Sequence, residues 1–123
     1  MLKRTNEFQK LIFILERHLA DMDVADVRVT ESKLVIDQDG ISREIDVALK
    51  GTIADHTILI AIESRDHKRN ADLKWVEEVI GQYQALDVSK VVMVSRSRFV
   101  RNAKRKAARN HIETLSLQDS REE

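Results

Sequence analysis

Residues 43–65 read REIDVALKGTIADHTILIAIESR, and this stretch decides the fold because it contains two alternating segments joined by a short polar connection. Apolar side chains occupy every second position of each segment, as Ile45, Val47 and Leu49 and then as Ile58, Ile60 and Ile62. A period of two places such side chains on one face of a β-strand. Gly51 is expected to end the first segment. The stretch therefore predicts two strands, over 43–50 and 57–65, that follow each other closely enough to pair.

Helical and strand patterns continue on both sides of this pair. Strands are predicted over 24–30 and 33–37 and over 90–95 and 112–117, and helices over 5–20, 71–86 and 98–110. Residues 90–95 form a nearly continuous apolar run, which is typical of a strand covered on both faces. A strand, a helix and a further apolar strand in succession imply a right-handed crossover. The predicted fold class is therefore α/β, with a mixed central sheet flanked by helices on both faces.

The composition indicates a soluble globular protein. Hydrophobic residues make up 42% of the 123 residues and charged residues 34%, a mixture too apolar for disorder and too polar for a membrane protein. No apolar run reaches the length of a membrane-spanning helix, and the N-terminal MLKRTNEF is unlike a signal peptide. We therefore expect a cytoplasmic protein with one domain over residues 1–123, a core over about 5–117 and an acidic tail over 118–123.

The absence of cysteine excludes several kinds of chemistry. A thiol nucleophile, a disulfide scaffold and a zinc or iron–sulfur site built on cysteine are all ruled out. The chain has three glycines and no proline, and it contains no glycine-rich phosphate loop. Any metal must therefore be bound by oxygen or imidazole ligands.

Positive charge is concentrated in one segment, although the whole chain has no net charge. Residues 95–111 contain seven cationic residues and no acid: Arg96, Arg98, Arg101, Lys104, Arg105, Lys106 and Arg109. Residues 119–123 contain three acids and one base. A basic face of this density is suited to nucleic-acid phosphates, and the alternative is an ordinary solvated helix.

Asp46 and Glu63 are the candidate catalytic acids. If their two strands are neighbours, the two carboxylates meet, and such a pair repels unless a hard cation such as Mg²⁺ lies between them. A cation held in this way polarises a phosphoryl oxygen and lowers the pKa of a bound water, as phosphodiester hydrolysis requires. The alternative is that both acids are strand-end residues paired with Arg43 or Lys50.

Three segments taken together resemble a known family. They are REIDV at 43–47, IAIESRDHKR at 60–69 and VVMVS at 91–95, the last followed by Phe99 and an alanine-rich helix. In this order they make the chain similar to the Mrr-type, restriction-endonuclease-like branch of the PD-(D/E)XK nuclease superfamily, over about residues 5–117. The resemblance implies a metal-dependent nuclease with an αβββαβ core, which agrees with the order of elements read from the periodicity.

The resemblance assigns a role to each residue around the acid pair. The motif aspartate falls on Asp46, without the proline of the motif's name before it, and the second motif acid falls on Glu63. Both would bind Mg²⁺, with Mn²⁺ as a substitute, together with the carbonyl of Ser64. The motif lysine falls on Arg65, which keeps the charge but cannot serve as a general base. Lys68 is close enough in sequence to reach back into the site.

The resemblance also points to accessory residues. Relatives carry an acid on the first helix, whose closest match here is Gln9, with Glu16 on the same flank. Gln82 and Gln84 lie in the helix after the motif, where relatives have a polar residue facing the site. The predicted nucleic-acid contacts are five cations: Arg69, Lys74, Arg101, Lys104 and Arg105.

These assignments predict a small Mg²⁺-dependent DNA endonuclease. Cleavage of both strands of a duplex would require a homodimer or two binding events. The alternative is a nuclease fold that has lost catalysis and serves as a DNA-binding or protein-interaction module, which Arg65, Gln9 and the missing proline favour. A third interpretation is a structural subunit whose basic helix contacts an acidic protein.

Overall fold

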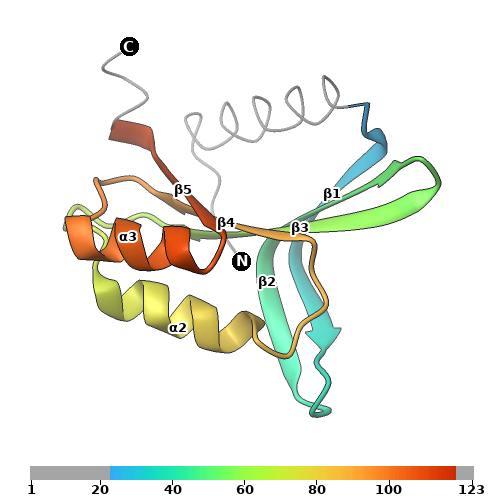
Figure 1. Cartoon of the computed structure of the whole chain (residues 1–123), viewed down its shortest axis with the longest axis horizontal. Coiled ribbons are helices and arrows are strands. Elements are labelled where there is room, and N and C mark those ends of the chain that lie inside the picture. The colour runs from blue at the N-terminus through green and yellow to red at the C-terminus, as the bar shows by residue number, and fades with distance from the viewer. Residues whose placement is uncertain (1–22, 119–123) are drawn as a thin grey trace.

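Five strands form a single sheet in the order β1-β2-β3-β4-β5 in the computed structural model, which describes residues 23–118 (Figure 1). The elements are β1 (Ala25–Ile36), β2 (Ser42–Ile53), β3 (His56–Arg65), α2 (Leu73–Tyr83), β4 (Lys90–Ser95), α3 (Arg101–Arg109) and β5 (Ile112–Ser116). Strands β1 to β3 pair antiparallel, whereas β3, β4 and β5 pair parallel. The predicted mixed α/β sheet is therefore confirmed. The helix predicted over 5–20 lies outside the described residues.

Strand β1 corrects the prediction of two short strands over 24–30 and 33–37. It is continuous through Glu31 and Ser32 and, after a register shift between Ala25 and Arg28, pairs with β2 in one register from Arg28 to Ile36. Ser32 has a φ of 51°, so this polar pair distorts the strand without ending it. The reason is that β2 offers hydrogen-bonding partners along the whole length, and this pairing outweighs the local turn preference.

Gly51 lies within β2 and does not end it, contrary to the sequence prediction. The strand continues to Ile53. A Cβ atom at Gly51 would lie 2.5 Å from Val24 Cγ1 and 3.2 Å from the Ala25 carbonyl oxygen. The glycine is therefore required by the close approach of the beginning of β1, because no side chain fits between the two strands.

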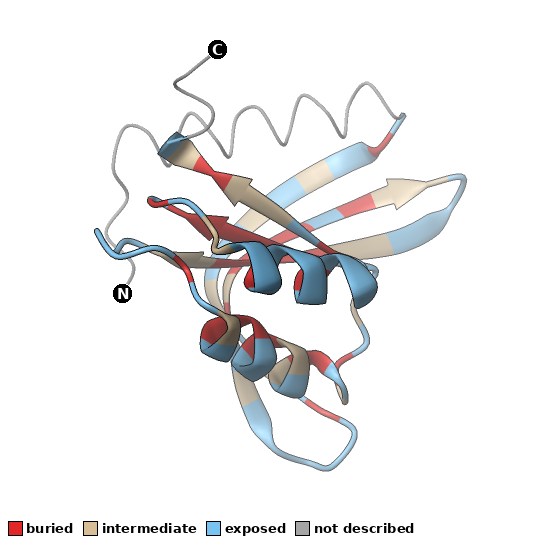
Figure 2. Cartoon of the chain, turned by 60° about the vertical axis from the view of Figure 1, so that its left-hand side comes forward, coloured by how far each residue is buried: buried red, intermediate tan, exposed pale blue. Residues whose placement is uncertain are grey.

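Helices α2 and α3 pack side by side on one face of the sheet (Figure 1). The core on this face includes Ile45, Ala61, Trp75, Val76, Met93, Ala103 and Ala107. A second apolar cluster lies on the opposite face and includes Val47, Leu49, Ile60, Ile62, Val92 and Val94. Strand β4 contributes to both clusters and is buried from Val91 to Ser95, as its continuous apolar run predicted (Figure 2). Both α2 and α3 lie on the same face, and the prediction of helices on both faces also involves the helix over 5–20, which the described residues do not include.

Both helices are shorter than the sequence pattern indicated. Helix α2 begins after Asp72, whose side chain caps it by accepting a hydrogen bond from the Trp75 N–H at 3.1 Å. Helix α3 begins after Val100, which has an extended backbone and no side-chain cap. None of the helices within residues 23–118 is long and apolar enough to cross a membrane.

Candidate active site

Two carboxylates meet where the pairing of β2 with β3 stops, at Val47 and Ile62. The Asp46 N–H donates to Glu63 Oε2 at 3.1 Å. In return, the Ser64 N–H donates to Asp46 Oδ2 at 3.1 Å. Each acid therefore binds the main chain of the other strand, and this exchange continues the strand pairing by one further step. The structure thus brings Asp46 and Glu63 together.

Burial disfavours the charged form of both acids. Glu63 is only 8% exposed, and desolvation, reinforced by the charge of Asp46, raises the pKa of its carboxyl from 4.5 to about 7. Burial also raises the pKa of Asp46, although the hydrogen bond from the Ser64 N–H opposes this shift. Within the described residues, Asp46 Oδ1 and Glu63 Oε1 accept no hydrogen bond. As far as residues 23–118 are concerned, these two carboxylate oxygens are available to a cation.

The alternative in which Arg43 or Lys50 pairs with these acids finds no support in the side-chain contacts. Arg43 Nε instead binds Asp37 Oδ2 at 3.1 Å, in the turn between β1 and β2. Lys50 is exposed and has no ion pair among residues 23–118. The acid pair therefore lacks a neutralising partner from either residue.

Helix α2 contributes Tyr83, a residue that the sequence analysis did not select for the site. The Tyr83 hydroxyl donates to Glu63 Oε2 at 2.8 Å, and both side chains are buried. Tyr83 falls within the helix predicted over 71–86, and the sequence analysis gave it no role. A signal was available, because a tyrosine on a buried stripe usually needs a hydrogen-bond partner for its hydroxyl.

Arg65 lies against α2. Its guanidinium carbon is 4.7 Å from the centre of the Trp75 ring, and Nη2 is 4.0 Å from Glu78 Oε2. Trp75 in turn stacks on Phe99 with the ring centres 5.8 Å apart. The cation at the motif position is therefore held by an aromatic stack and a partly exposed ion pair. Trp75 belongs to the buried core and also supports Arg65.

Lys68 and Arg69 are exposed in the loop that follows β3. This loop is bound to the loop after β4 by main-chain hydrogen bonds from the Arg96 N–H to the Arg65 carbonyl at 3.1 Å and from the Ala71 N–H to the Arg98 carbonyl at 2.9 Å. An ion pair between Arg96 and Asp66 at 3.3 Å and a hydrogen bond from the Ser97 hydroxyl to the His67 carbonyl join them further. The two basic loops therefore form one connected edge of the molecule.

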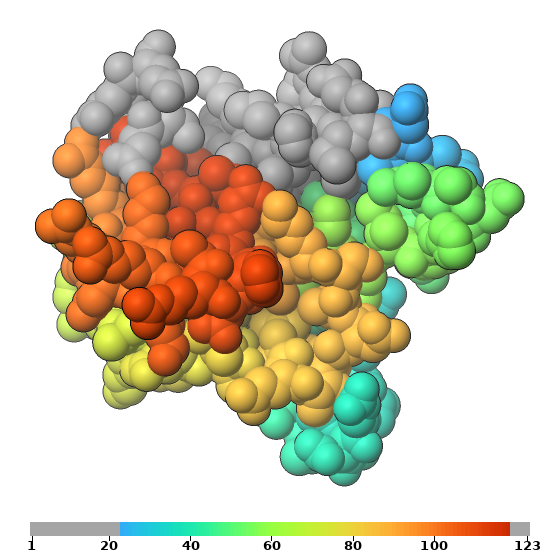
Figure 3. Space-filling model, viewed as in Figure 1, coloured from blue at the N-terminus to red at the C-terminus, as the bar shows by residue number. Residues whose placement is uncertain are grey.

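The cations of the helices are exposed. Lys74 lies on α2, while Arg101, Lys104 and Arg105 lie on α3, whose buried side consists of Ala103 and Ala107. Figure 3 shows α3 as the orange segment across the front of the molecule. The structure thus places the predicted phosphate contacts on the surface, where a nucleic acid could reach them.

The accessory glutamines have different positions. Gln82 Nε2 donates to the Glu44 carbonyl at 2.9 Å, so its amide binds the main chain of β2 two residues before Asp46. Gln84 is exposed. Gln9 and Glu16 lie outside the described residues.

Few side chains within residues 23–118 are placed to bind a metal ion together. Residues 23–118 contain no group of three or more histidine, cysteine, aspartate or glutamate side chains arranged to hold an ion. Ser64 follows Glu63 on β3, so its side chain belongs to the opposite face of the strand, where its hydroxyl is buried and has no hydrogen-bond partner among residues 23–118. Ser64 therefore contributes to the acid site through its main chain.

The fold and the paired acids define a restriction-endonuclease-like domain, and comparison with protein families agrees. The profile of the Mrr catalytic family, described as a restriction endonuclease, matches residues 5–122. The chain therefore belongs to this restriction endonuclease family. A search of curated proteins found no match.

Solved structures of low sequence identity share the fold. A protein of unknown function, AF1548, has a TM-score of 0.64 at 16% identity over 84% of this chain and 54% of its own. The restriction endonuclease MspJI, solved with a 27-mer oligonucleotide, has a TM-score of 0.59 at 11% identity over 91% of this chain and 26% of its own. Can2 from Sulfobacillus thermosulfidooxidans, solved with cyclic tetra-adenylate, has a TM-score of 0.55 at 19% identity over 92% of this chain and 32% of its own. The chain thus spans about half or less of each of these proteins.

Proposed function

We propose that this protein is a metal-dependent DNA endonuclease that hydrolyses phosphodiester bonds at Asp46 and Glu63. The observation that carries the proposal is the reciprocal exchange of hydrogen bonds between each carboxylate and the main chain of the neighbouring strand. This exchange holds two acids side by side at the end of a strand pair. Arg43 does not neutralise them, because it pairs with Asp37. Family membership and the shared fold support the same conclusion.

Asp46, Glu63 and the main chain of Ser64 are the residues that would hold Mg²⁺, or Mn²⁺ in its place. The fit rests on the two carboxylate oxygens that accept no hydrogen bond within the described residues and on the unfavourable charge of the buried pair. Hard divalent cations prefer such oxygen ligands. When bound, the ion would polarise a phosphoryl oxygen of the DNA and favour ionisation of water.

In this proposal Arg65, two residues after Glu63 on β3, supplies a fixed positive charge on the same face of the strand. Its stacking on Trp75 restricts the guanidinium, which can donate two hydrogen bonds to a phosphate but remains protonated throughout. Arg65 would therefore orient the scissile phosphate and balance charge. Lys68, on the exposed loop after β3, is the nearest lysine in sequence that could share this role.

DNA is the proposed partner of the cationic surface. The exposed residues that would contact its phosphates are Arg69, Lys74, Arg101, Lys104 and Arg105. Cleavage of both strands by one acid site requires a homodimer or two binding events, and sedimentation with and without DNA would distinguish them. This role agrees with the cytoplasmic location expected from the sequence.

A second candidate function is a nuclease fold without catalysis that binds DNA or a protein. The observation in its favour is that the motif position carries Arg65, whose guanidinium is engaged by Trp75 and Glu78. Arginine stays protonated and therefore cannot act as a general base. The two functions differ in whether DNA is cut once it is bound.

Cleavage by Asp46→Asn and Glu63→Gln variants tests the proposal. Supercoiled, linear and branched DNA should be incubated with the parent in Mg²⁺, Mn²⁺ or chelator, with Glu77→Gln, an exposed change on α2, as the matched control. Each site variant should lose on the order of 100-fold in rate while still binding DNA, since each removes a metal ligand. Cleavage equal to the parent in both variants would reject the site. Binding without cleavage by the parent under every condition would favour the second function.

A further inference from the structure

Two adjacent residues in the last turn of α2 contact the two strands that carry the acids. Gln82 Nε2 donates to the Glu44 carbonyl at 2.9 Å, which fixes the main chain of β2 two residues before Asp46. The Tyr83 hydroxyl donates to Glu63 Oε2 at 2.8 Å, which fixes the side chain of the second acid on β3. One helical turn therefore reaches both partners of the acid pair.

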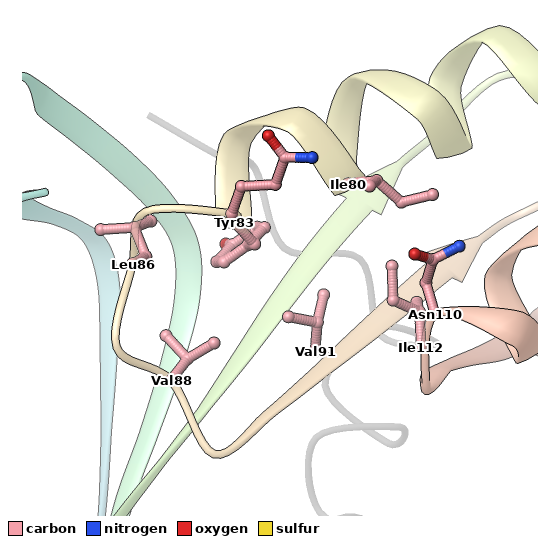
Figure 4. Close-up of a pocket in the computed structure, with 8 residues that line it drawn as sticks. Ile80, Tyr83, Leu86, Val88, Val91, Asn110 and Ile112 are labelled. Carbon is pink, nitrogen blue, oxygen red and sulfur yellow. The ribbon is translucent and has the colours of Figure 1, made fainter. Parts of the chain in front are cut away.

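The Tyr83 ring is itself held in place. It is 8% exposed and lines a cavity of about 230 Å³ (Figure 4). The other residues that line this cavity include Ile80, Leu86, Val88, Val91 and Ile112. Tyr83 also belongs to the buried core on this face, together with Val79, Leu86 and Val91, so turning the ring away would expose apolar surface. The position of the hydroxyl is therefore determined by the apolar packing behind it.

The contacts at Glu63 define the orientation of its carboxylate. Oε2 accepts one hydrogen bond from Tyr83 and another from the Asp46 N–H, whereas Oε1 accepts none within the described residues. A ligand oxygen that is already oriented loses less conformational freedom when it binds a cation. The buried Tyr83 thus orients Glu63 so that Oε1 is presented to the proposed cation site.

On the basis of the proposed function, we infer that Gln82 and Tyr83 form a carboxylate clamp, in which they act as positioning residues that set the separation of Asp46 and Glu63 and thereby the affinity for a divalent cation. Tyr83 acts directly on a proposed ligand, and Gln82 acts through the main chain of Glu44. Removal of Tyr83's hydroxyl should therefore have the larger effect. The clamp touches neither the DNA nor the cation itself.

Mn²⁺ binding to the DNA-free protein, measured by titration calorimetry, tests the clamp. Tyr83→Phe keeps the ring and removes only the hydroxyl, and it should weaken Mn²⁺ binding by about 10-fold, the usual range for loss of a residue that orients a metal ligand. Gln82→Ala should weaken it less, and the exposed control Glu77→Gln should match the parent. In single-turnover cleavage, the Mn²⁺ concentration for half-maximal rate should rise by the same factor in Tyr83→Phe and excess Mn²⁺ should restore the rate. A purely structural role would not produce this recovery.

Amide hydrogen exchange in chelator gives a second measurement that needs neither metal nor activity. The Asp46 N–H donates to Glu63 Oε2, so its exchange should become several-fold faster in Tyr83→Phe, with no change at Ile60, which pairs with Leu49 further along the β2–β3 pairing. Unchanged exchange together with unchanged Mn²⁺ affinity in folded Tyr83→Phe would overturn the clamp. Failure of the parent to bind Mn²⁺ would instead reject the proposed function, and the exchange rate at Asp46 would still decide whether Tyr83 positions Glu63.

Discussion

Burial and the charge of Asp46 disfavour the ionised form of the Glu63 carboxyl group. These effects raise its pKa from 4.5 to about 7 in the folded protein. Between these two values the folded state holds more protons than the unfolded state, so the free energy of unfolding falls as the pH rises. The fall should begin near pH 4.5, level off above pH 7 and amount to on the order of 3 kcal/mol in the absence of metal. Urea denaturation in chelator across this range measures it.

The Glu63→Gln variant is the control for this pH dependence. Glutamine has no charge, so most of the loss of stability between pH 4.5 and 7 should disappear, and the part due to the raised pKa of Asp46 should remain. The variant should then be more stable than the parent at pH 8. Parallel stability curves for the two proteins would show that Glu63 titrates near its ordinary value.

Arg65 combines a charge with a planar stacking surface. Arg65→Lys keeps the charge and restores the residue of the superfamily motif, so cleavage should equal or exceed that of the parent. The loss of stacking on Trp75 should lower the free energy of unfolding by about 0.5–1 kcal/mol. Arg65→Ala should reduce cleavage severely. If Arg65→Ala and the parent cut DNA at the same rate, the motif cation must be Lys68 or another group.

At the scale of the elements, two glycines allow opposite predictions. Gly51→Ala places a Cβ 2.5 Å from Val24 Cγ1 and 3.2 Å from the Ala25 carbonyl oxygen, so β1 and β2 must separate, which should cost roughly 1–3 kcal/mol of stability. Gly81→Ala on α2 meets nothing within 4 Å and should stabilise the helix by up to about 1 kcal/mol. Urea denaturation of both variants measures the difference. A stabilising Gly51→Ala would mean that the beginning of β1 does not pack against β2 in solution.

At the scale of the whole molecule, the net charge is zero, but seven cations and no acid occur over residues 95–111, which include α3. Replacing Arg101, Lys104 and Arg105 of α3 by glutamine should weaken duplex DNA binding across all sequences. Each lost phosphate contact should also make the slope of log affinity against log salt shallower by about 0.9. Fluorescence anisotropy at several salt concentrations measures both quantities.

A matched triple variant separates this local effect from the change in total charge. It removes three cations from β1 and β2 instead: Arg28, Lys33 and Lys50. The control should keep nearly the salt slope of the parent. If the α3 variant also keeps it, the DNA surface lies elsewhere, around Lys68, Arg69 and Lys74.

The sequence by itself determined β3, β4 and the approximate positions of α2 and α3, because side-chain periodicity and apolar runs are local properties. The alternating isoleucines of β3 and the continuous apolar run of β4 each gave the observed element, and the mixed sheet follows from their order. The same reasoning placed Asp46 and Glu63 on strands that could be neighbours, and the resemblance to the nuclease family selected them as the site.

Only the tertiary structure decided how residues far apart in the chain act on one another. It joined the two predicted segments of β1 because β2 pairs with both. It kept Gly51 inside a strand because Val24 lies against it, and it brought Tyr83 to Glu63 across twenty positions of sequence. Neither contact leaves a periodic trace in the sequence, since each depends on how a helix or a strand end packs against the sheet. The surroundings of the acid pair are therefore a property of the packing, whereas its two members could be selected from their strands.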